Sequence, residues 1–263
     1  MKTTFLTRFA DRLILVPTRH AIDTPGKSRR LIPFGDGQLE IWTHRVGAER
    51  EADVNLFVLK FPGAGSRAEC STDHPAEQWP DARAETWAVN YPGYGGSSGR
   101  ASLQSMAAAA DTVIAELERR AAGRPIVAVG NSLGCVSSLY MAAQERIQGL
   151  VLRNPPALRE VILERYGWWG MNVGARLIAS QIPDALCSIR NAAAASAPAV
   201  IVTSGRDRIV PHKCQQMIVD AYAGPKRTLM LPEADHHTPM TDEQSEQYAE
   251  QLGWLFETLK STR

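Results

Sequence analysis

The feature that most constrains this chain is a buried strand that passes into a helix without a loop. Four apolar residues at 126–129 run directly into the sequence Gly-Asn-Ser-Leu-Gly at 130–134, and such an apolar run is typical of a fully buried strand. A turn this tight strains its central residue, and a side chain at Gly130 or Gly134 is expected to collide with the neighbouring strand or helix. Ser132 is therefore predicted to project at the carboxyl end of the strand, beside the first N–H groups of the helix.

The composition is that of an ordinary globular protein and excludes several classes of partner. Hydrophobic residues make up 44% of the 263 residues, which is enough for one substantial core. The 29 basic and 28 acidic residues give a net charge of +1, so nothing favours nucleic acid or an anionic membrane as partner. The four cysteines form no C-x-x-C pair, and the apolar run at 13–16 is too short to span a bilayer. We therefore expect a cytoplasmic protein without an integral membrane segment.

Alternating strand and helix patterns predict an α/β fold, with a mostly parallel sheet covered by helices on both faces. We expect a single domain over residues 1–263, with residues 1–28 as a peripheral lead-in and residues 155–198 as a short helical lid. The predicted strands are 30–34, 38–43, 55–61, 86–91, 126–129, 149–152, 199–203 and 227–231, and the predicted helices include a segment ending at 79, then 102–121, 211–222 and 241–260.

Two later strands end in residues that can activate a serine. Asp207 follows the strand at 199–203 after a glycine turn, and His236 and His237 follow the strand at 227–231. A serine hydroxyl is a weak nucleophile that needs a base within reach and an acid to orient that base. Because the carboxyl ends of parallel strands meet at one edge of a sheet, these side chains are expected to meet Ser132 there. The order Ser, Asp, His predicts a catalytic triad in which either histidine is the base.

Backbone N–H groups near Ser132 are candidates for an oxyanion hole. Such a hole normally uses the residue after the nucleophile and a residue from the loop after an earlier strand, which here are Leu133 and Ala64. Aromatic side chains at Tyr94, Trp168 and Trp169 are candidates for the lining of a substrate pocket, although aromatic residues of a lid also anchor it to the core.

With these motifs the chain resembles the α/β-hydrolase superfamily, in particular its esterase, lipase and serine-aminopeptidase-like members with small caps. The loop at 90–99 is similar to the family's D-Y-x-G-x-G-x-S-x-G loop, and the segment at 205–211 is similar to its acid loop. The resemblance implies that His236 is the base and that His237 takes the place of the family's asparagine. Two residues depart from the family pattern, Pro62 in place of histidine and Asp235 in place of glycine, and Asp235 adds a carboxylate that could compete with Asp207 for the base.

The resemblance implies a serine hydrolase that cleaves a carboxylic ester, or a related small-molecule acyl substrate, through an acyl-enzyme without cofactor or metal. A serine peptidase or thioesterase on the same fold is an alternative, as is a non-catalytic binding protein. A dinucleotide-binding oxidoreductase is disfavoured. Residues 63–68 form a G-x-G-x-x-A sequence, but the next strand ends in Asn90-Tyr91, where a ribose-binding acid is expected.

Overall fold

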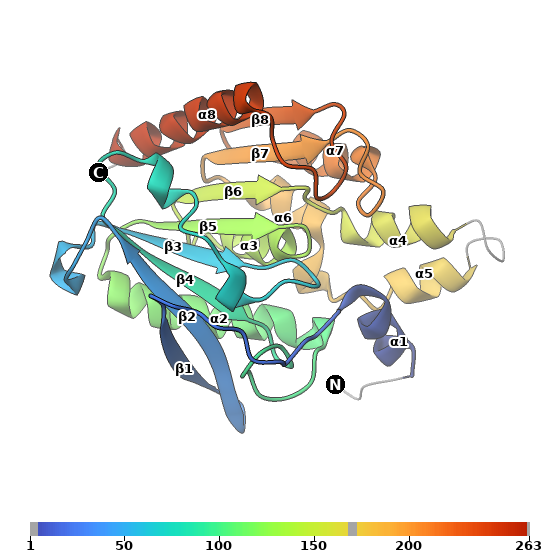
Figure 1. Ribbon diagram of the computed structural model, residues 1–263. Helices are drawn as coiled ribbons and strands as arrows, with labels where there is room; N and C mark the ends of the chain where they lie inside the picture. The colour runs from blue at the N-terminus through green and yellow to red at the C-terminus, as the bar shows by residue number, and fades with distance from the viewer. Residues whose placement is uncertain (1–4, 168–172, 262–263) are drawn as a thin grey trace.

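A computed structural model describes residues 5–167 and 173–261 and contains one eight-stranded sheet in the order β1-β2-β4-β3-β5-β6-β7-β8 (Figure 1). The pairs β1–β2 and β2–β4 are antiparallel, and all the remaining neighbouring pairs are parallel. The predicted, mostly parallel sheet is therefore confirmed. The strands are β1 (Ser28–Phe34), β2 (Gly37–Val46), β3 (Leu56–Phe61), β4 (Ala84–Asn90), β5 (Ile126–Asn131), β6 (Gly149–Arg153), β7 (Ala199–Ser204) and β8 (Lys226–Leu231).

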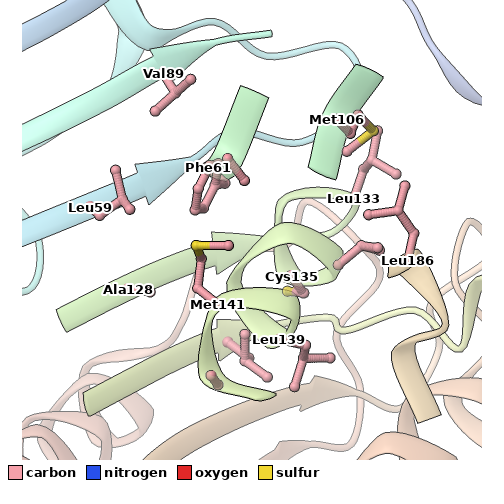
Figure 2. Close-up of a cluster of buried hydrophobic side chains, with 14 of the residues drawn as sticks. Leu59, Phe61, Val89, Met106, Ala128, Leu133, Cys135, Leu139, Met141 and Leu186 are labelled. Atoms are coloured by element: carbon pink, nitrogen blue, oxygen red, sulfur yellow. The ribbon is translucent and has the colours of Figure 1, made fainter. Parts of the chain in front are cut away.

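Helices cover both faces of the sheet because successive side chains along each strand point to opposite sides. Phe57 and Leu59 of β3 face the larger core, whereas Leu56 and Val58 face a second core against the C-terminal helix. Figure 2 shows part of the larger core, in which side chains of α2 and α3 pack against the sheet. The helices are α1 (Phe5–Ile14), α2 (Leu103–Ala121), α3 (Gly134–Ala143), α4 (Leu158–Tyr166), α5 (Val173–Ala179), α6 (Ser188–Ala194), α7 (His212–Ala221) and α8 (Asp242–Ser261). None of those found within the described ranges is both long and apolar enough to cross a membrane.

The predicted helix ending at residue 79 is wrong. Two short 3₁₀ turns, Ala68–Cys70 and Ala76–Gln78, replace it, with irregular backbone and a turn at residues 74–75 between them. Pro75 explains the difference, because a proline in a helix interior removes a backbone donor and clashes with the preceding turn. The sheet face beside α8 consequently lacks a helix at this point.

The N-terminal residues are less peripheral than predicted. They form helix α1, whose Asp11 carboxylate accepts the backbone N–H of Leu103 at 2.9 Å and so caps α2. Beyond this helix the guanidinium of Arg19 donates to the carbonyls of Gly93, Ser97 and Gly99 at 2.8–3.0 Å. The lead-in is thus bonded to the glycine-rich loop that follows β4.

The segment 155–198 contains three helices that have different surroundings. Helix α6 packs against α3 and α7, within the layer that covers the sheet. Helices α4 and α5 pack on each other, and α1 packs against α5, on the side toward which the parallel strands point (Figure 1). Only α4 and α5 therefore stand outside the main layers. Trp168 and Trp169, between them, lie outside the described residues.

The turn from β5 into α3 has the predicted geometry. Ser132 has a φ of 52°, a left-handed conformation that is rare for residues other than glycine. A Cβ at Gly130 would lie 2.5 Å from Cα of Cys135, and one at Gly134 would lie 1.9 Å from the carbonyl oxygen of Phe61. The prediction that these glycines avoid collisions with helix and strand is confirmed.

Gly134→Ala is expected to lower the free energy of unfolding by about 3 kcal/mol, because the added methyl would overlap backbone of β3 that cannot rotate away. Urea unfolding followed by circular dichroism measures the change. Gly253→Ala is the matched control, since a Cβ there meets nothing within 4 Å. This second change is expected to be neutral or slightly stabilising in helix α8, and an equal loss in both variants would contradict the steric argument.

Candidate active site

The loops after β7 and β8 bring an acid and a histidine together. Nδ1 of His236 lies 2.6 Å from Oδ2 of Asp207, and their side chains are 6% and 0% exposed. A hydrogen bond from imidazole to a buried carboxylate fixes the ring orientation and leaves Nε2 free to exchange a proton. The pair therefore has the arrangement of a base and its orienting acid.

Both oxygens of the Asp207 carboxylate accept hydrogen bonds. Its Oδ1 accepts the N–H groups of Ile209 and Val210, each at 2.8 Å, and its Oδ2 also accepts Nε2 of Gln215 at 3.1 Å. Gln215 further accepts the N–H of Ser204 and donates to the carbonyl of Val210. The sequence analysis missed Gln215, because a glutamine in a helix after an acid loop carries no distinctive spacing.

Ser132 is linked to the His236 loop through the end of the neighbouring strand β6. The N–H of Ser132 donates to the carbonyl of Arg153 at 2.8 Å. The next residue, Asn154, is fully buried with a φ of 52°, and its Nδ2 donates to the carbonyl of His236 at 3.1 Å. Within the described ranges no hydrogen bond joins the Ser132 hydroxyl to His236. Catalytic hydrogen bonds of this kind commonly shorten only when substrate binds.

Asp235 and His237 occupy different positions from Asp207 and His236. The Asp235 carboxylate accepts the backbone N–H groups of His236 at 2.7 Å and of Arg208 at 3.1 Å, and these bonds lower the pKa of Asp235. It binds backbone and makes no hydrogen bond to the imidazole in the described structure. The ring of His237 stands edge-on to that of His236, with centroids 4.8 Å apart. Asp235 thus shapes the loop, and the histidine bonded to Asp207 is His236.

The loop that carries Ala64 is anchored by Tyr94. The Tyr94 hydroxyl donates to the Ala64 carbonyl at 2.8 Å, and the N–H of Val16 approaches both oxygens at 3.1 Å. The Tyr94 side chain is 1% exposed, so it positions this loop rather than lining an open pocket. Burial raises the pKa of Tyr94 to about 12 and keeps its hydroxyl a hydrogen-bond donor. In the described part of the chain, the N–H groups of Ala64 and Leu133 donate no hydrogen bond, as an oxyanion hole requires.

A buried polar network fixes the end of β4. Asn90 donates to Glu40 at 2.7 Å and to Glu69 at 2.8 Å, and Glu40 also accepts the N–H of Gly96. Burial opposes ionisation of Glu40, but these hydrogen bonds and the guanidinium of Arg29 outweigh it and lower the pKa of Glu40. The network ties the glycine-rich loop to the segment after β3.

Among the described residues, no group of three or more His, Cys, Asp or Glu side chains is arranged to hold a metal ion.

Comparisons with known proteins agree with this architecture. Residues 61–181 match the family described as "alpha/beta hydrolase fold". Two uncharacterized proteins of Mycobacterium tuberculosis, MT2364 (strain CDC 1551) and Rv2307c (strain H37Rv), are each 35% identical over 153 residues, which is 57% of this chain and 52% of theirs. The chain thus spans about half the length of these curated relatives.

Solved structures with the same fold are much less similar in sequence. The esterase Pf2001 of Pyrococcus furiosus has a TM-score of 0.64 at 13% identity, over 94% of this chain and 98% of its own. Est1E of Butyrivibrio proteoclasticus with bound ferulic acid has a TM-score of 0.63 at 16% identity, over 85% and 99%. At such identities the likeness establishes the fold alone. The family match over residues 61–181 and these structural likenesses agree that the chain has the α/β-hydrolase fold.

Proposed function

We propose that the protein is a serine hydrolase that cleaves a carboxylic ester or related acyl substrate. The observation that carries this proposal is the buried hydrogen bond between Asp207 and His236, located at the sheet edge where the strained turn presents Ser132. The match of residues 61–181 to the α/β-hydrolase family supports it, since hydrolysis on this fold uses a nucleophile at the same turn. Helices α4 and α5, at that edge, are the proposed lid.

In the proposed reaction, Oγ of Ser132 attacks the carbonyl carbon while Nε2 of His236 takes the hydroxyl proton. The N–H groups of Ala64 and Leu133 stabilise the negative charge that develops on the carbonyl oxygen. The tetrahedral intermediate then breaks its bond to the leaving alcohol, which receives the proton from His236. A water molecule, deprotonated by the same imidazole, attacks the acyl-enzyme and releases the carboxylic acid and free Ser132.

Labelling with a fluorophosphonate probe tests whether Ser132 is activated. The folded protein is expected to react once per chain, and mass spectrometry of the modified peptide is expected to place the phosphonate on Ser132. The heat-unfolded protein is the control, because labelling depends on the assembled site. Folded protein that stays unlabelled and hydrolyses no p-nitrophenyl ester would favour the non-catalytic alternative.

Asp207→Asn is expected to lower kcat for p-nitrophenyl acetate by about 100-fold or more, because an amide facing Nδ1 stabilises the wrong imidazole tautomer. Asp235→Asn is the matched control and is expected to cause a much smaller loss, since the amide oxygen still accepts both backbone N–H groups. Steady-state kinetics of the two variants separate the roles. A reversed order of losses would move the orienting acid to Asp235.

A further inference from the structure

A cavity of about 340 Å³ opens where the helix predicted to end at residue 79 is missing. Its floor is the α8 face of the sheet, formed by Lys60, Ala88, Val129 and Val151, and Tyr248 of α8 forms part of its wall. This volume is at the small end of the range for ligand pockets, which are commonly apolar with a few convergent polar groups. The cavity therefore has the size and lining of a site for a small molecule or part of one.

The charged residues that line this cavity are all basic, although the whole chain is nearly neutral. They are Lys60, Arg67 and Arg153, and within the described ranges no aspartate or glutamate joins them. Arg67 is neutralised by an ion pair with Glu69. Neither Lys60 nor Arg153 forms an ion pair in the described structure. Burial lowers the pKa of Lys60 to about 8, and the more distant charges of Asp73 and Glu77 oppose that shift. The lining itself therefore carries an excess of positive charge that these carboxylates offset only in part.

Backbone carbonyls hold the two unpaired cations in place. Nζ of Lys60 donates to the carbonyls of Thr72 at 2.7 Å and of His74 at 2.9 Å. Nη2 of Arg153 donates to the carbonyl of Thr238 at 2.8 Å. Arg153 keeps further N–H donors, and a guanidinium suits the geometry of a carboxylate or phosphate.

His74 lies in the field of both cations. Its Nε2 is 2.8 Å from the Tyr248 hydroxyl, and the two rings stack with centroids 5.4 Å apart. Burial, followed by the charges of Lys60 and Arg153, lowers the pKa of His74 to about 4. The imidazole is therefore neutral at pH 7, so the positive charge that a bound anion would meet comes from Lys60 and Arg153.

The cavity reaches the flank of the strained turn. Gly63, Gly130 and Asn131 line it, whereas Ser132 and His236 do not. A Cβ at Gly63 would lie 3.6 Å from Cβ of Ser132, so this part of the cavity wall adjoins the residue that carries the proposed nucleophile. A substrate whose carbonyl is at Ser132 thus has this cavity beside it.

We propose that the cavity binds an anionic oxygen group of the substrate, with Arg153 and Lys60 as the recognising cations and Ala88, Val129 and Val151 contacting its methylene groups. This assignment rests on the proposed function for its link to the substrate, and it names the substrate class: acyl compounds that carry a second, negatively charged end. Carboxylate and phosphate share the chemistry that the cavity recognises.

Equilibrium binding tests the cavity without catalysis. Isothermal titration calorimetry of the full chain with glutarate is expected to show saturable binding that Arg153→Gln weakens about tenfold, a typical loss for one charge-assisted contact. Arg119→Gln, an exposed site on α2, removes the same charge far from the cavity and is expected to bind like the natural chain. The same titration with inorganic phosphate is compared with that of glutarate. The anion with the lower Kd shows whether the cavity prefers a phosphate or a carboxylate. Failure of both anions to bind the natural chain would overturn the proposal.

Substitution of Arg153 also removes its hydrogen bond to the carbonyl of Thr238, which could disturb the structure. A second pair of variants therefore tests the cavity without changing Arg153. Cys70 is exposed and lines the cavity, so its substitution leaves the core intact. Cys70→Glu introduces a competing carboxylate and is expected to weaken glutarate binding by about tenfold, whereas Cys70→Gln is expected to leave it unchanged. Equal affinities in these two variants would contradict recognition by charge.

Kinetics separate this proposal from the proposed function. The p-nitrophenyl half-ester of glutaric acid is expected to have a kcat/KM about tenfold above that of neutral p-nitrophenyl valerate, and Cys70→Glu is expected to remove this preference. Ester turnover without any preference or glutarate binding would refute the subsite and leave the hydrolase intact. Glutarate binding by a protein whose Ser132 resists the fluorophosphonate would refute the hydrolase and retain the anion site.

Discussion

Ser132→Ala is expected to lower kcat for p-nitrophenyl acetate by about 10³-fold or more. In the proposed mechanism Oγ of Ser132 is the protein atom that bonds to the acyl carbon, and the members of a triad act as a unit. The remaining rate would come from water activated by His236 near the donors of Ala64 and Leu133. Initial rates at saturating ester, measured on protein whose folding is verified by circular dichroism, give the ratio.

Ser137→Ala provides a comparison for the loss of a serine hydroxyl near the same turn. Ser137 is fully buried in α3 and accepts a hydrogen bond from Tyr91 at 3.0 Å, so its loss is expected to affect stability more than turnover. If Ser132→Ala retained the rate of the natural chain, the acyl-enzyme route through this serine would be wrong.

His236→Ala is expected to cause a loss of similar size, about 10³-fold, because no other group takes the proton from the nucleophile. His237→Ala is the matched control, since it removes the adjacent imidazole without touching the bond to Asp207. We expect it to keep most of the activity. Steady-state rates of both variants and fluorophosphonate labelling of Ser132 in each measure the difference, and equal losses would assign the base to neither histidine alone.

The strained turn and the mostly parallel sheet were predictable because both depend on local patterns. Short apolar runs mark the buried strands, and the glycines at 130 and 134 are required by close contacts with the following helix and the neighbouring strand. Since parallel strands place their carboxyl ends on one edge, Asp207 and the two histidines could be placed near Ser132 from the sequence. The structure adds which imidazole faces Asp207.

What the sequence did not reveal depends on contacts between distant residues. Asp11 caps a helix that begins 92 residues later. Asn154, after β6, donates a hydrogen bond to the carbonyl of His236 in the loop after β8. Neither residue type signals such a partner by its spacing. The prediction of a helix ending at residue 79 was wrong for a local reason. It followed the alternation of strands and helices along the chain, whereas Pro75 within the segment prevents a continuous helix.

The shared carbonyl of Ala64 couples the N-terminal segment thermodynamically to the proposed oxyanion loop. Val16 and Tyr94 both donate to this oxygen, so docking of the segment and ordering of the proposed oxyanion loop stabilise each other. By reciprocity, an inhibitor that immobilises the loop strengthens docking of the segment by the same factor. Occupancy at Ser132 would then be reported by slower hydrogen exchange at the Val16 amide, more than a hundred residues away in the sequence.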